Sequence, residues 1–460
     1  MMARTKNTFP QPVKTYIKTI PVPSGRDVSR PGPAKGAIKT VSFAGQPFPV
    51  SPILDTFFWY MAERHRIHQL RCAGQEKPWS KDDILNSHCF TNVFRVYDRT
   101  TQYILRNVIQ KGSQDLYEVT FRVLLFRFFN RPETWEYLEE HLGNPTLKWS
   151  EFDVGAYDRV LSLLVSRTGS ALYGAAYICP APPFGWPKNH SNHLRLVQLL
   201  MNDDLPKELV KCKFLKDAHG RIGLYPSIGD FIGFQLLLDL NMSSHFKWSE
   251  QEWAALGPGS SACLRKMFGP SIAGYEQDAI RYLYESQESH FARLGITRNQ
   301  VPRLCEGRPA GVSAVDIEHS LCECEKYSRG RFPHIKGKRT QVGRTFKASS
   351  EPITTEIPEH WKYPVAKMAP PLNPPPALVD KGQVWYEVSH IVAEKKNSGS
   401  GGGGGGSVGK GKYLVRWVGY GPEDDWWQEE KDLENDAPVL LAQWTATKNR
   451  IAKRIAQLQL

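Results

Sequence analysis

The stretch that decides the fold of the C-terminal part reads Tyr413-Leu414-Val415-Arg416-Trp417-Val418-Gly419-Tyr420. Two segments, 384–392 and 412–418, alternate apolar and polar residues, which is typical of half-buried strands. Trp427 follows, and an apolar segment over 437–444 reads as a packing helix. We therefore predict a small antiparallel sheet closed by a helix.

This order of parts resembles a chromodomain, the methyl-lysine reader of the heterochromatin protein family. The resemblance covers residues 383–446 and includes a W-x-G-Y turn, a Trp seven positions after its Tyr, and the closing helix. It implies a three-stranded antiparallel sheet with a packing helix. It also implies that the family's histone tail adds to the first strand as an extra strand.

The resemblance implies a methyl-lysine cage made of Tyr386, Trp417 and Tyr420, with Asp424 near its mouth. A methylated ammonium keeps its positive charge, so the faces of aromatic rings can replace the water around it. The family positions that contact the tail fall on Gln428 and Asp432. Gln428 stands where the family usually has Glu, so the preferred tail stays open. The alternative is three core aromatics in a small barrel without a ligand.

A run of six glycines lies within residues 397–409 and has the composition of an interdomain linker. It falls between the two predicted strands, so we interpret it as a hairpin insertion. The entropy of closing a loop grows only logarithmically with its length. The chromodomain should therefore fold despite the insertion.

Length and composition indicate a globular protein. The chain has 460 residues, 41% hydrophobic and 11% aromatic, which favours several domains. No apolar segment approaches the roughly 18 residues of a membrane span, so we expect no membrane partner. Eight cysteines without framework spacing are typical of a reduced compartment. Together with the chromodomain resemblance, this predicts a nuclear, chromatin-bound protein.

The net charge of +12 favours a polyanionic partner. Residues 1–41 read as a disordered basic tail, and residues 331–382 as a basic and then proline-rich linker. Both could hold the chain near phosphate, or could simply solubilise and connect it. Ala3-Arg4-Thr5-Lys6 matches the opening of the histone H3 tail, which we interpret as a chance match.

Residues 42–330 carry a helical pattern almost throughout. Ser51-Pro52 predicts the start of a helix that runs to residue 71 and is closed by Gly74. A second helix is predicted over residues 90–111. Its polar stripe has spacings of four, three and four residues, and consists of Arg95, Arg99, Gln102 and Arg106. Such a ridge can grip phosphates, although a solvated basic face would look the same.

Several phrases in this region resemble the helical domain of the 5-hydroxymethyldeoxyuridine (5-hmdU) DNA kinases. They are Phe90-Thr91-Asn92-Val93-Phe94-Arg95 with Asp98-Arg99, Leu124 to Asn130, Pro226 to Phe231, Gly257 to Ser260, and Ile317 to Glu323. The resemblance implies a helical fold related to helix-hairpin-helix DNA glycosylases. It also implies a double-stranded DNA partner, with modified thymine such as 5-hydroxymethyluracil as a candidate base.

Two glycine-rich turns, 226–229 and 257–260, precede predicted helices, where backbone N–H groups can bind a phosphate. Plain turns are the alternative. The predicted DNA-contacting residues are Arg64, Asn92, Arg95, Arg99, Gln102, Gly229, Gly257 and Gly259.

Asp239 is the candidate catalytic residue, because it ends an apolar helix and could polarise water in a glycosylase-like pocket. A structural polar residue at the helix end is the alternative. No phosphate-loop motif G-x-x-x-x-G-K-[ST] occurs in the sequence, so we predict no self-sufficient kinase. His319, Cys322 and Cys324 lack the paired spacing of a zinc site. We therefore predict neither a metal nor a cofactor.

The combined interpretation is a chromatin-associated protein. A chromodomain reads a methylated lysine on a histone H3 tail and tethers, through a flexible segment, a helical domain that binds DNA. Residues 447–460 form a C-terminal helical extension. The alternative is an active base-modifying or glycosylase-like enzyme, working alone or with a separate kinase or base-oxidising partner.

Overall fold

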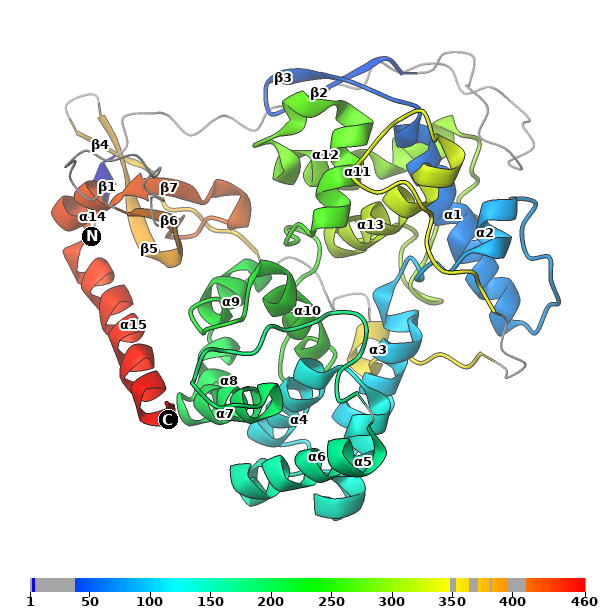
Figure 1. Cartoon of the computed structure of the whole chain (residues 1–460). Helices are drawn as coiled ribbons and strands as arrows, with labels where there is room; N and C mark the ends of the chain where they lie inside the picture. Colours follow the sequence, from blue (N-terminus) through cyan, green and yellow to red (C-terminus); the bar gives the residue numbers. More distant parts are fainter. Residues whose placement is uncertain are drawn as a thin grey trace, which may run out of the picture. The chain divides into compact units, whose positions relative to one another are not determined.

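The computed structural model describes residues 2–4, 38–169, 171–347, 353–363, 371–380, 383–395 and 411–459 (Figure 1). The chain divides into two compact units whose segments interleave along the sequence. Unit 1 combines Met1–Gln11, Ile104–Trp248 and Ala369–Leu460, and unit 2 combines Pro12–Tyr103 and Ser249–Met368. The prediction of a mainly helical chain with a C-terminal antiparallel sheet is confirmed. Within the described ranges, no helix combines the length and apolar character needed to cross a bilayer.

The described part of unit 2 starts with an antiparallel hairpin and continues with helices. The hairpin pairs β2 (Thr40–Phe43) with β3 (Gln46–Pro49). The α-helices are α1 (Ile53–Cys72), α2 (Asp83–Ser87), α3 (Arg99–Tyr103), α11 (Pro258–Phe268), α12 (Glu276–Arg293) and α13 (Ala314–Arg331). Short 3-10 turns cover Arg95–Tyr97, Pro270–Ile272 and Glu359–Lys362. The core of this unit lies where α1, α11 and α12 pack against α13.

The predicted helix from residue 51 to 71 is confirmed by α1 to within two residues. Ser51 Oγ accepts a hydrogen bond from the backbone N–H of Ile53 at 3.3 Å. Gly74 follows the helix with a φ of +72°, a conformation that glycine adopts without a Cβ clash. Residues next to the helix in sequence, Ser51 before it and Gly74 after it, therefore mark its two ends.

The prediction of one continuous helix over residues 90–111 is wrong. The segment consists of a 3-10 turn, α3 and a π-helix (Ile104–Ile109). The break falls at Asp98, which is extended (φ −73°, ψ 143°). Its Oδ1 accepts the backbone N–H of Asn92 at 2.7 Å, so the carboxylate closes a turn instead of facing outward from a helix. The predicted polar stripe therefore has no continuous helix to carry it.

The predicted linker is attached to unit 2 at several points, although most of its described residues are exposed. The prediction of a flexible segment over 331–382 is wrong at those points. Cys89 N–H donates to Arg344 O at 2.9 Å, and Arg308 Nη1 donates to Tyr363 O at 2.5 Å. Trp361 is buried. Backbone hydrogen bonds and one buried aromatic thus attach these residues to the rest of unit 2.

The helical part of unit 1 follows the π-helix. Its helices are α4 (Leu116–Phe129), α5 (Pro132–Leu142), α6 (Val154–Thr168), α7 (Asn189–Asn202), α8 (Leu205–Val210), α9 (Leu215–Ile222) and α10 (Asp230–Leu240), with a 3-10 turn at Trp149–Glu151. Helices α9 and α10 pack together across a short turn, which has the order of a helix-hairpin-helix. In that turn Ser227 has a φ of +64°, and Gly229 caps α10.

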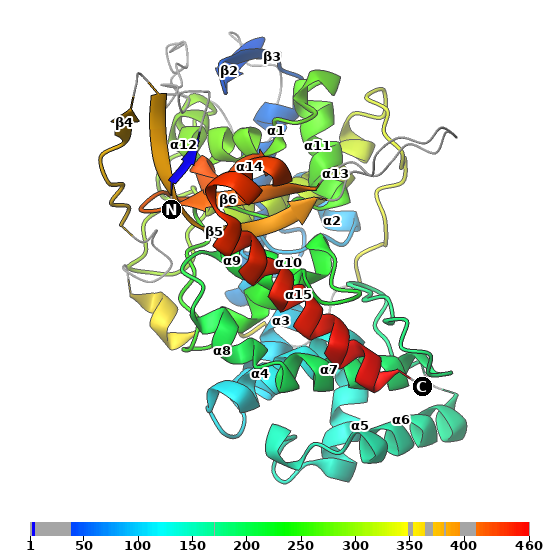
Figure 2. The same cartoon turned by 90° about the vertical axis from the view of Figure 1, so that its left-hand side faces the viewer.

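The C-terminal part of unit 1 is a small sheet with two helices. Strands β5 (Gln383–Lys395), β6 (Lys412–Trp417) and β7 (Trp426–Glu429) form an antiparallel meander, and a 3-10 turn covers Pro422–Asp424. Helices α14 (Glu430–Asp436) and α15 (Pro438–Leu458) follow. Figure 2 shows α15 running from the sheet toward α7. This helix begins at Pro438, well before the extension predicted at 447. The sheet core is Val388, Ile391, Tyr413, Val415, Trp417, Leu433 and Ala437.

The predicted glycine-rich insertion at 397–409 lies outside the described residues. Its flanks are described, and Lys395 is paired with Lys412 across β5 and β6. The run therefore connects the ends of two paired strands.

Two further strands add to β5. Strand β4 (Leu378–Asp380) pairs antiparallel with it, and so does β1 (Met2–Arg4). Residues 2–4 belong to the segment predicted as a disordered tail, so that prediction is wrong for them. Residues 1 and 5–37 of the same tail lie outside the described residues.

Candidate functional site

The three predicted cage residues come together on the small sheet. Tyr386 lies on β5, Trp417 ends β6, and Tyr420 follows the turn at Gly419. The ring centroids of Tyr386 and Trp417 are 6.1 Å apart at 60°, and those of Tyr386 and Tyr420 are 5.9 Å apart at 82°. Edge-to-face rings at these centroid distances are typical of packed aromatic side chains, and the same steep angles also suit a cage for a cation.

The three rings differ in exposure. Trp417 is 1% exposed and belongs to the sheet core, whereas Tyr386 and Tyr420 are half-buried and pack against that core. Burial raises the pKa of Tyr420, and the nearby Tyr386 and Asp424 raise it further. Asp424 is thus close enough to influence Tyr420 electrostatically.

The turn between β6 and Tyr420 requires glycine. Gly419 has a φ of +80°, and a Cβ at this position would collide with the backbone of Asn373 and Pro374. Asn373 N–H donates to Gly419 O at 3.1 Å. The glycine therefore allows residues 371–380 to lie close against the cage turn.

The two predicted tail-contacting residues have different environments. Gln428 is buried on β7 opposite Tyr413, whereas Asp432 is exposed on α14. Only the second is accessible to a partner in this conformation. Sequence reasoning missed Trp426, which is 44% exposed at the start of β7. Its signal was a Trp-Trp pair at a strand, where alternation must turn at least one ring outward.

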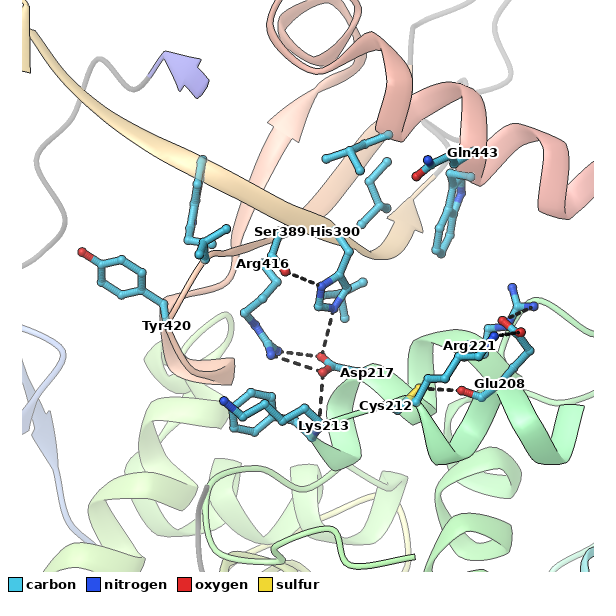
Figure 3. Close-up of a pocket in the computed structure, with 18 of the residues that line it drawn as sticks. Glu208, Cys212, Lys213, Asp217, Arg221, Ser389, His390, Arg416, Tyr420 and Gln443 are labelled. Atoms are coloured by element: carbon cyan, nitrogen blue, oxygen red, sulfur yellow. Dashed lines mark hydrogen bonds and ion pairs between the residues drawn. The ribbon is translucent and has the colours of Figure 1, made fainter. Parts of the chain in front are cut away.

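A cavity of about 570 Å³ separates the sheet from α8 and α9 within unit 1 (Figure 3). Its walls combine residues of the sheet and α15 with residues of the helices. Tyr420, His390 and Gln443 line it from one side, and Arg221 and Glu208 from the other. The cage residues Trp417 and Tyr420 therefore border this cavity on one flank.

A buried ionic network holds the sheet to α9. Arg416 Nη2 lies 2.9 Å from Asp217 Oδ1 and donates to Asp425 Oδ2 at 3.0 Å. Lys216 Nζ lies 2.8 Å from Asp425 Oδ2. The side chains of Arg416, Asp217 and Asp425 are at most 7% exposed. A buried pair of this kind is costly to break, because the remaining charge is left uncompensated.

Close backbone packing accompanies the network. A Cβ on Gly220 of α9 would collide with the carbonyl oxygen of Val392 on β5. On α15, Arg450 and Arg454 form ion pairs with the buried carboxylate of Asp203 at 2.9 Å and 2.7 Å. The prediction that only a flexible segment tethers the sheet is therefore wrong, since the sheet is docked on the helices of unit 1.

Several of the residues predicted to contact DNA are not presented to a ligand. Arg64 is buried and donates from Nη2 to Phe90 O at 3.1 Å. Gln102 is buried and donates to Val96 O at 2.6 Å, and Arg95 is buried as well. The expectation that these three face DNA is therefore wrong in this structure. The helix expected to expose Arg95 and Gln102 is broken, and Arg64 is among the buried residues of α1.

The glycines at 257 and 259 serve packing. Gly257 is buried, and its N–H donates to Glu318 Oε1 at 3.0 Å and to Ser260 Oγ at 3.0 Å. A Cβ on Gly259 would collide with Cys322 Sγ of α13. These glycines allow α11 and α13 to cross closely, so the predicted phosphate contact at this turn is not supported.

Four of the predicted DNA contacts remain accessible in whole or part. Arg99 and Gly229 are exposed, and Asn92 and Gly259 are half-buried. Gly229 caps α10 without a side-chain hydrogen bond, and it is exposed although Ile228 before it is buried. The first N–H groups of α10 have no partner within the helix. Arg99 and Gly229 belong to different units.

Asp239 lies in the interior at 0% exposure. It accepts hydrogen bonds from Nε and Nη2 of Arg127, and Arg127 Nη1 donates to Asn130 Oδ1 at 3.2 Å. The guanidinium also lies 5.2 Å from the ring centroid of Tyr177. This geometry favours the structural alternative for Asp239, because its carboxylate is already engaged by a buried cation.

Sequence reasoning missed a buried polar centre in unit 2, formed by side chains of α1, α13 and the turn around Asp98. Its members are Tyr60, Arg64, Asp98, His319 and Glu323. His319 Nε2 lies 3.3 Å from Asp98 Oδ2. Burial lowers the pKa of His319, but Asp98, Glu323 and Glu318 outweigh that effect and raise it. In the sequence, two pairs spaced by four residues indicate that their side chains share a helix face. They are Tyr60 with Arg64 and His319 with Glu323.

Among the described residues, no cluster of three or more His, Cys, Asp or Glu side chains is arranged to hold a metal ion. Cys322 and Cys324 differ in exposure, since the first is partly exposed and the second is buried.

Comparison with protein families explains the motifs of the helical region. The family model "5-hmdU DNA kinase, helical domain" matches residues 51–337, which is more than half of the chain. The chain belongs to this family. The model of the Chromo (CHRromatin Organisation MOdifier) domain matches residues 386–446, so the small sheet with its helices is a chromodomain.

A curated relative is the "5-hmdU DNA kinase" of Bacillus phage SP10. It is 24% identical over 318 residues, which cover 62% of this chain and 47% of the phage protein. The chain thus spans about half the length of that relative. No solved structure matches significantly.

Proposed function

We propose that the chromodomain binds a methylated lysine on a histone H3 tail. The observation that carries this proposal is the convergence of Tyr386, Trp417 and Tyr420, from a strand, a strand end and a turn, into a group of steeply inclined rings. Each contact between a cation and an aromatic ring contributes roughly 0.5 to 2 kcal/mol. Asp424 adds a negative charge beside Tyr420.

We propose further that the helical domain contacts double-stranded DNA, with 5-hydroxymethyluracil as the candidate modified base. The support is family membership together with the exposed Gly229 at the start of α10 and the exposed Arg99. Uncapped N–H groups at a helix start can bind a phosphate, and an exposed guanidinium can pair with another. The proposal implies a nuclear, chromatin-bound protein.

Peptide binding tests the first proposal. Labelled H3-tail peptides, unmodified or trimethylated at single lysines, are titrated with the full chain in a fluorescence-polarisation assay. We expect tighter binding of at least one trimethylated peptide, and loss of that preference in Tyr386→Ala. Trp426→Ala is the matched control, because this exposed ring lies outside the cage. Equal affinity for modified and unmodified peptides would refute the proposal.

Duplex binding tests the second proposal. Matched duplexes containing thymine, 5-hydroxymethyluracil or 5-methylcytosine are compared at several salt concentrations. We expect salt-dependent binding to all three and a preference for the 5-hydroxymethyluracil duplex. Binding that does not change with salt would contradict phosphate contact.

A second candidate function, base modification, rests on the buried polar centre. Its hydroxyl and guanidinium groups at Tyr60 and Arg64 include atoms, Oη and Nη1, without a hydrogen-bond partner among the described residues. A buried polar atom without a hydrogen-bond partner calls for an explanation, and a catalytic role is one of them. The chain would act alone or with a separate kinase or base-oxidising protein. Unchanged nucleosides in mass spectra after long incubation with modified duplex would exclude turnover by the chain alone.

A further inference from the structure

Residues Met2–Arg4 form β1 and pair antiparallel with the start of the chromodomain's first strand. In this register Met2 is opposite Glu387, Ala3 is opposite Tyr386, and Arg4 is opposite Trp385. Strand β1 also lies against α14. A segment that begins hundreds of residues away in sequence therefore lies between β5 and α14.

These two elements carry the residues predicted to receive a histone tail. Tyr386 on β5 is a cage wall, and the exposed Asp432 on α14 is a predicted tail contact. A strand edge binds an extended peptide through its free N–H and C=O groups, and one edge can pair with only one strand at a time. Strand β1 thus covers the backbone groups that an incoming peptide would need.

The opposite edge of the same residues is also occupied. Strand β4 pairs with β5 so that Leu378 is opposite Trp385 and Asp380 is opposite Gln383. Trp385 is therefore flanked by β4 on one edge and by β1 on the other. Within the described part of the chain, a peptide could not add beside Trp385 and Tyr386 without displacing one of these two strands.

The sequence of β1 resembles that of the peptide with which it would compete for the edge of β5. Ala3 and Arg4 are the first two residues of the four-residue match to the opening of the histone H3 tail. The match was interpreted above as chance. Its pairing beside Tyr386 gives it a structural consequence, because a segment that resembles the expected ligand occupies the expected ligand edge.

We propose that residues 2–4 are an internal ligand strand of the chromodomain, which a histone-type peptide must displace in order to bind. This inference rests on the proposed tail-binding function, whose regulation it specifies. A ligand on a short flexible linker acts at a roughly millimolar effective concentration, and we take about 1 mM for this segment. With an intrinsic Kd of about 0.1 mM it occupies the edge about nine-tenths of the time, so its removal lowers the apparent Kd of an external peptide about tenfold.

The test compares full-length chains that differ only in this segment. One variant lacks residues 2–6, and a second carries Ala3→Pro, because proline is poorly tolerated in a paired strand. The matched controls lack residues 12–16 or carry Lys14→Pro. The probe is a labelled H3-tail peptide trimethylated at the lysine of its Ala-Arg-Thr-Lys opening, measured by fluorescence polarisation. We expect about tenfold tighter binding by both segment variants and unchanged binding by both controls.

Hydrogen exchange of the backbone supplies a readout that does not depend on the peptide. Amides between residues 383 and 388 should exchange faster in both segment variants than in the controls, because β1 no longer covers them. Faster exchange without peptide binding in any chain would contradict the proposed tail binding while leaving the internal strand intact. Peptide binding that is equal in all chains, with unchanged exchange, would overturn the internal strand and leave tail binding intact. Weaker binding in the segment variants would also overturn it, since β1 would then be part of the reader.

Discussion

The chromodomain and the helical domain were both predicted to present a set of ligand-binding side chains. In the structure one set lies together and the other is dispersed. The cage residues converge, with Tyr386 and Tyr420 half-buried around Trp417. The arginine stripe of the helical domain is dispersed, because Arg95 is buried and Arg99 exposed on either side of a break at Asp98. Side chains predicted to share one face of paired strands do so when the strand register is as predicted. Side chains predicted to share one face of a helix do not when a single residue interrupts that helix.

The largest expected effect concerns a polar pair in the interior of the helical domain. Asp239→Asn should lower the free energy of unfolding by about 3 to 5 kcal/mol, because Arg127 is left as an uncompensated buried charge. Chemical denaturation measures this loss. A loss of this size would show that these charged residues of the helical domain stabilise its core and do not bind a ligand.

The matched control for this pair is Asp204→Asn. Asp204 and Lys207 form an ion pair 3.8 Å apart with both side chains more than half exposed, so the loss should not exceed about 1 kcal/mol. Equal effects of the two substitutions would show that the Arg127 pair is not buried in solution.

Acid should affect the helical domain before the chromodomain. Burial lowers the pKa of four of its histidines, to about 4 for His65 and His193 and to about 3 for His68 and His290. Below the ordinary pKa of about 6.5 the unfolded chain binds protons that the folded chain does not, so stability is lost as pH falls from 6.5 toward 4. Each histidine contributes up to about 1.4 kcal/mol per pH unit.

Hydrogen exchange at pH 6.5 and 5 measures this loss region by region, in α1 and α12 and in β5 and β6. His290→Gln should reduce the pH dependence of stability. If both regions lost protection together, the helices and the chromodomain would be one cooperative unit.

An intermediate effect is expected at the cage. Tyr386→Ala and Tyr420→Ala should each weaken trimethyl-lysine peptide binding by about 0.5 to 2 kcal/mol, while thermal stability changes little because both rings are partly exposed. Isothermal titration calorimetry measures the first quantity and thermal melting the second. Trp417→Ala should instead lower stability as well, since this ring lies in the core. Unchanged peptide affinity in both tyrosine variants would favour three core aromatics without a ligand.

The smallest effect separates the two arginines on either side of the break. Arg99→Glu should reduce the slope of log affinity against log salt for duplex DNA by about 1, with no change in melting temperature. Arg95→Glu should lower the melting temperature, because it places a carboxylate at a buried position. An unchanged salt slope in Arg99→Glu would remove this residue from the DNA-contacting surface.

The sequence by itself determined the features that depend on neighbours along the chain. Strand alternation, the Gly419 turn and the start of α1 predicted the chromodomain and the first long helix, because each follows from local backbone preferences. The same holds for the family membership of residues 51–337, which ordered motifs indicated before any geometry.

Only the tertiary structure decided which polar groups are used inside the protein. Asp239 meets Arg127 across 112 positions, and Arg416 meets Asp217 across 199, so no local pattern could show that these charges compensate one another. The same reason applies to residues 2–4, whose place beside Tyr386 depends on backbone pairing between distant segments. Burial and strand pairing between remote residues are properties of the folded chain, and they decide which of the predicted sites remain open to a partner.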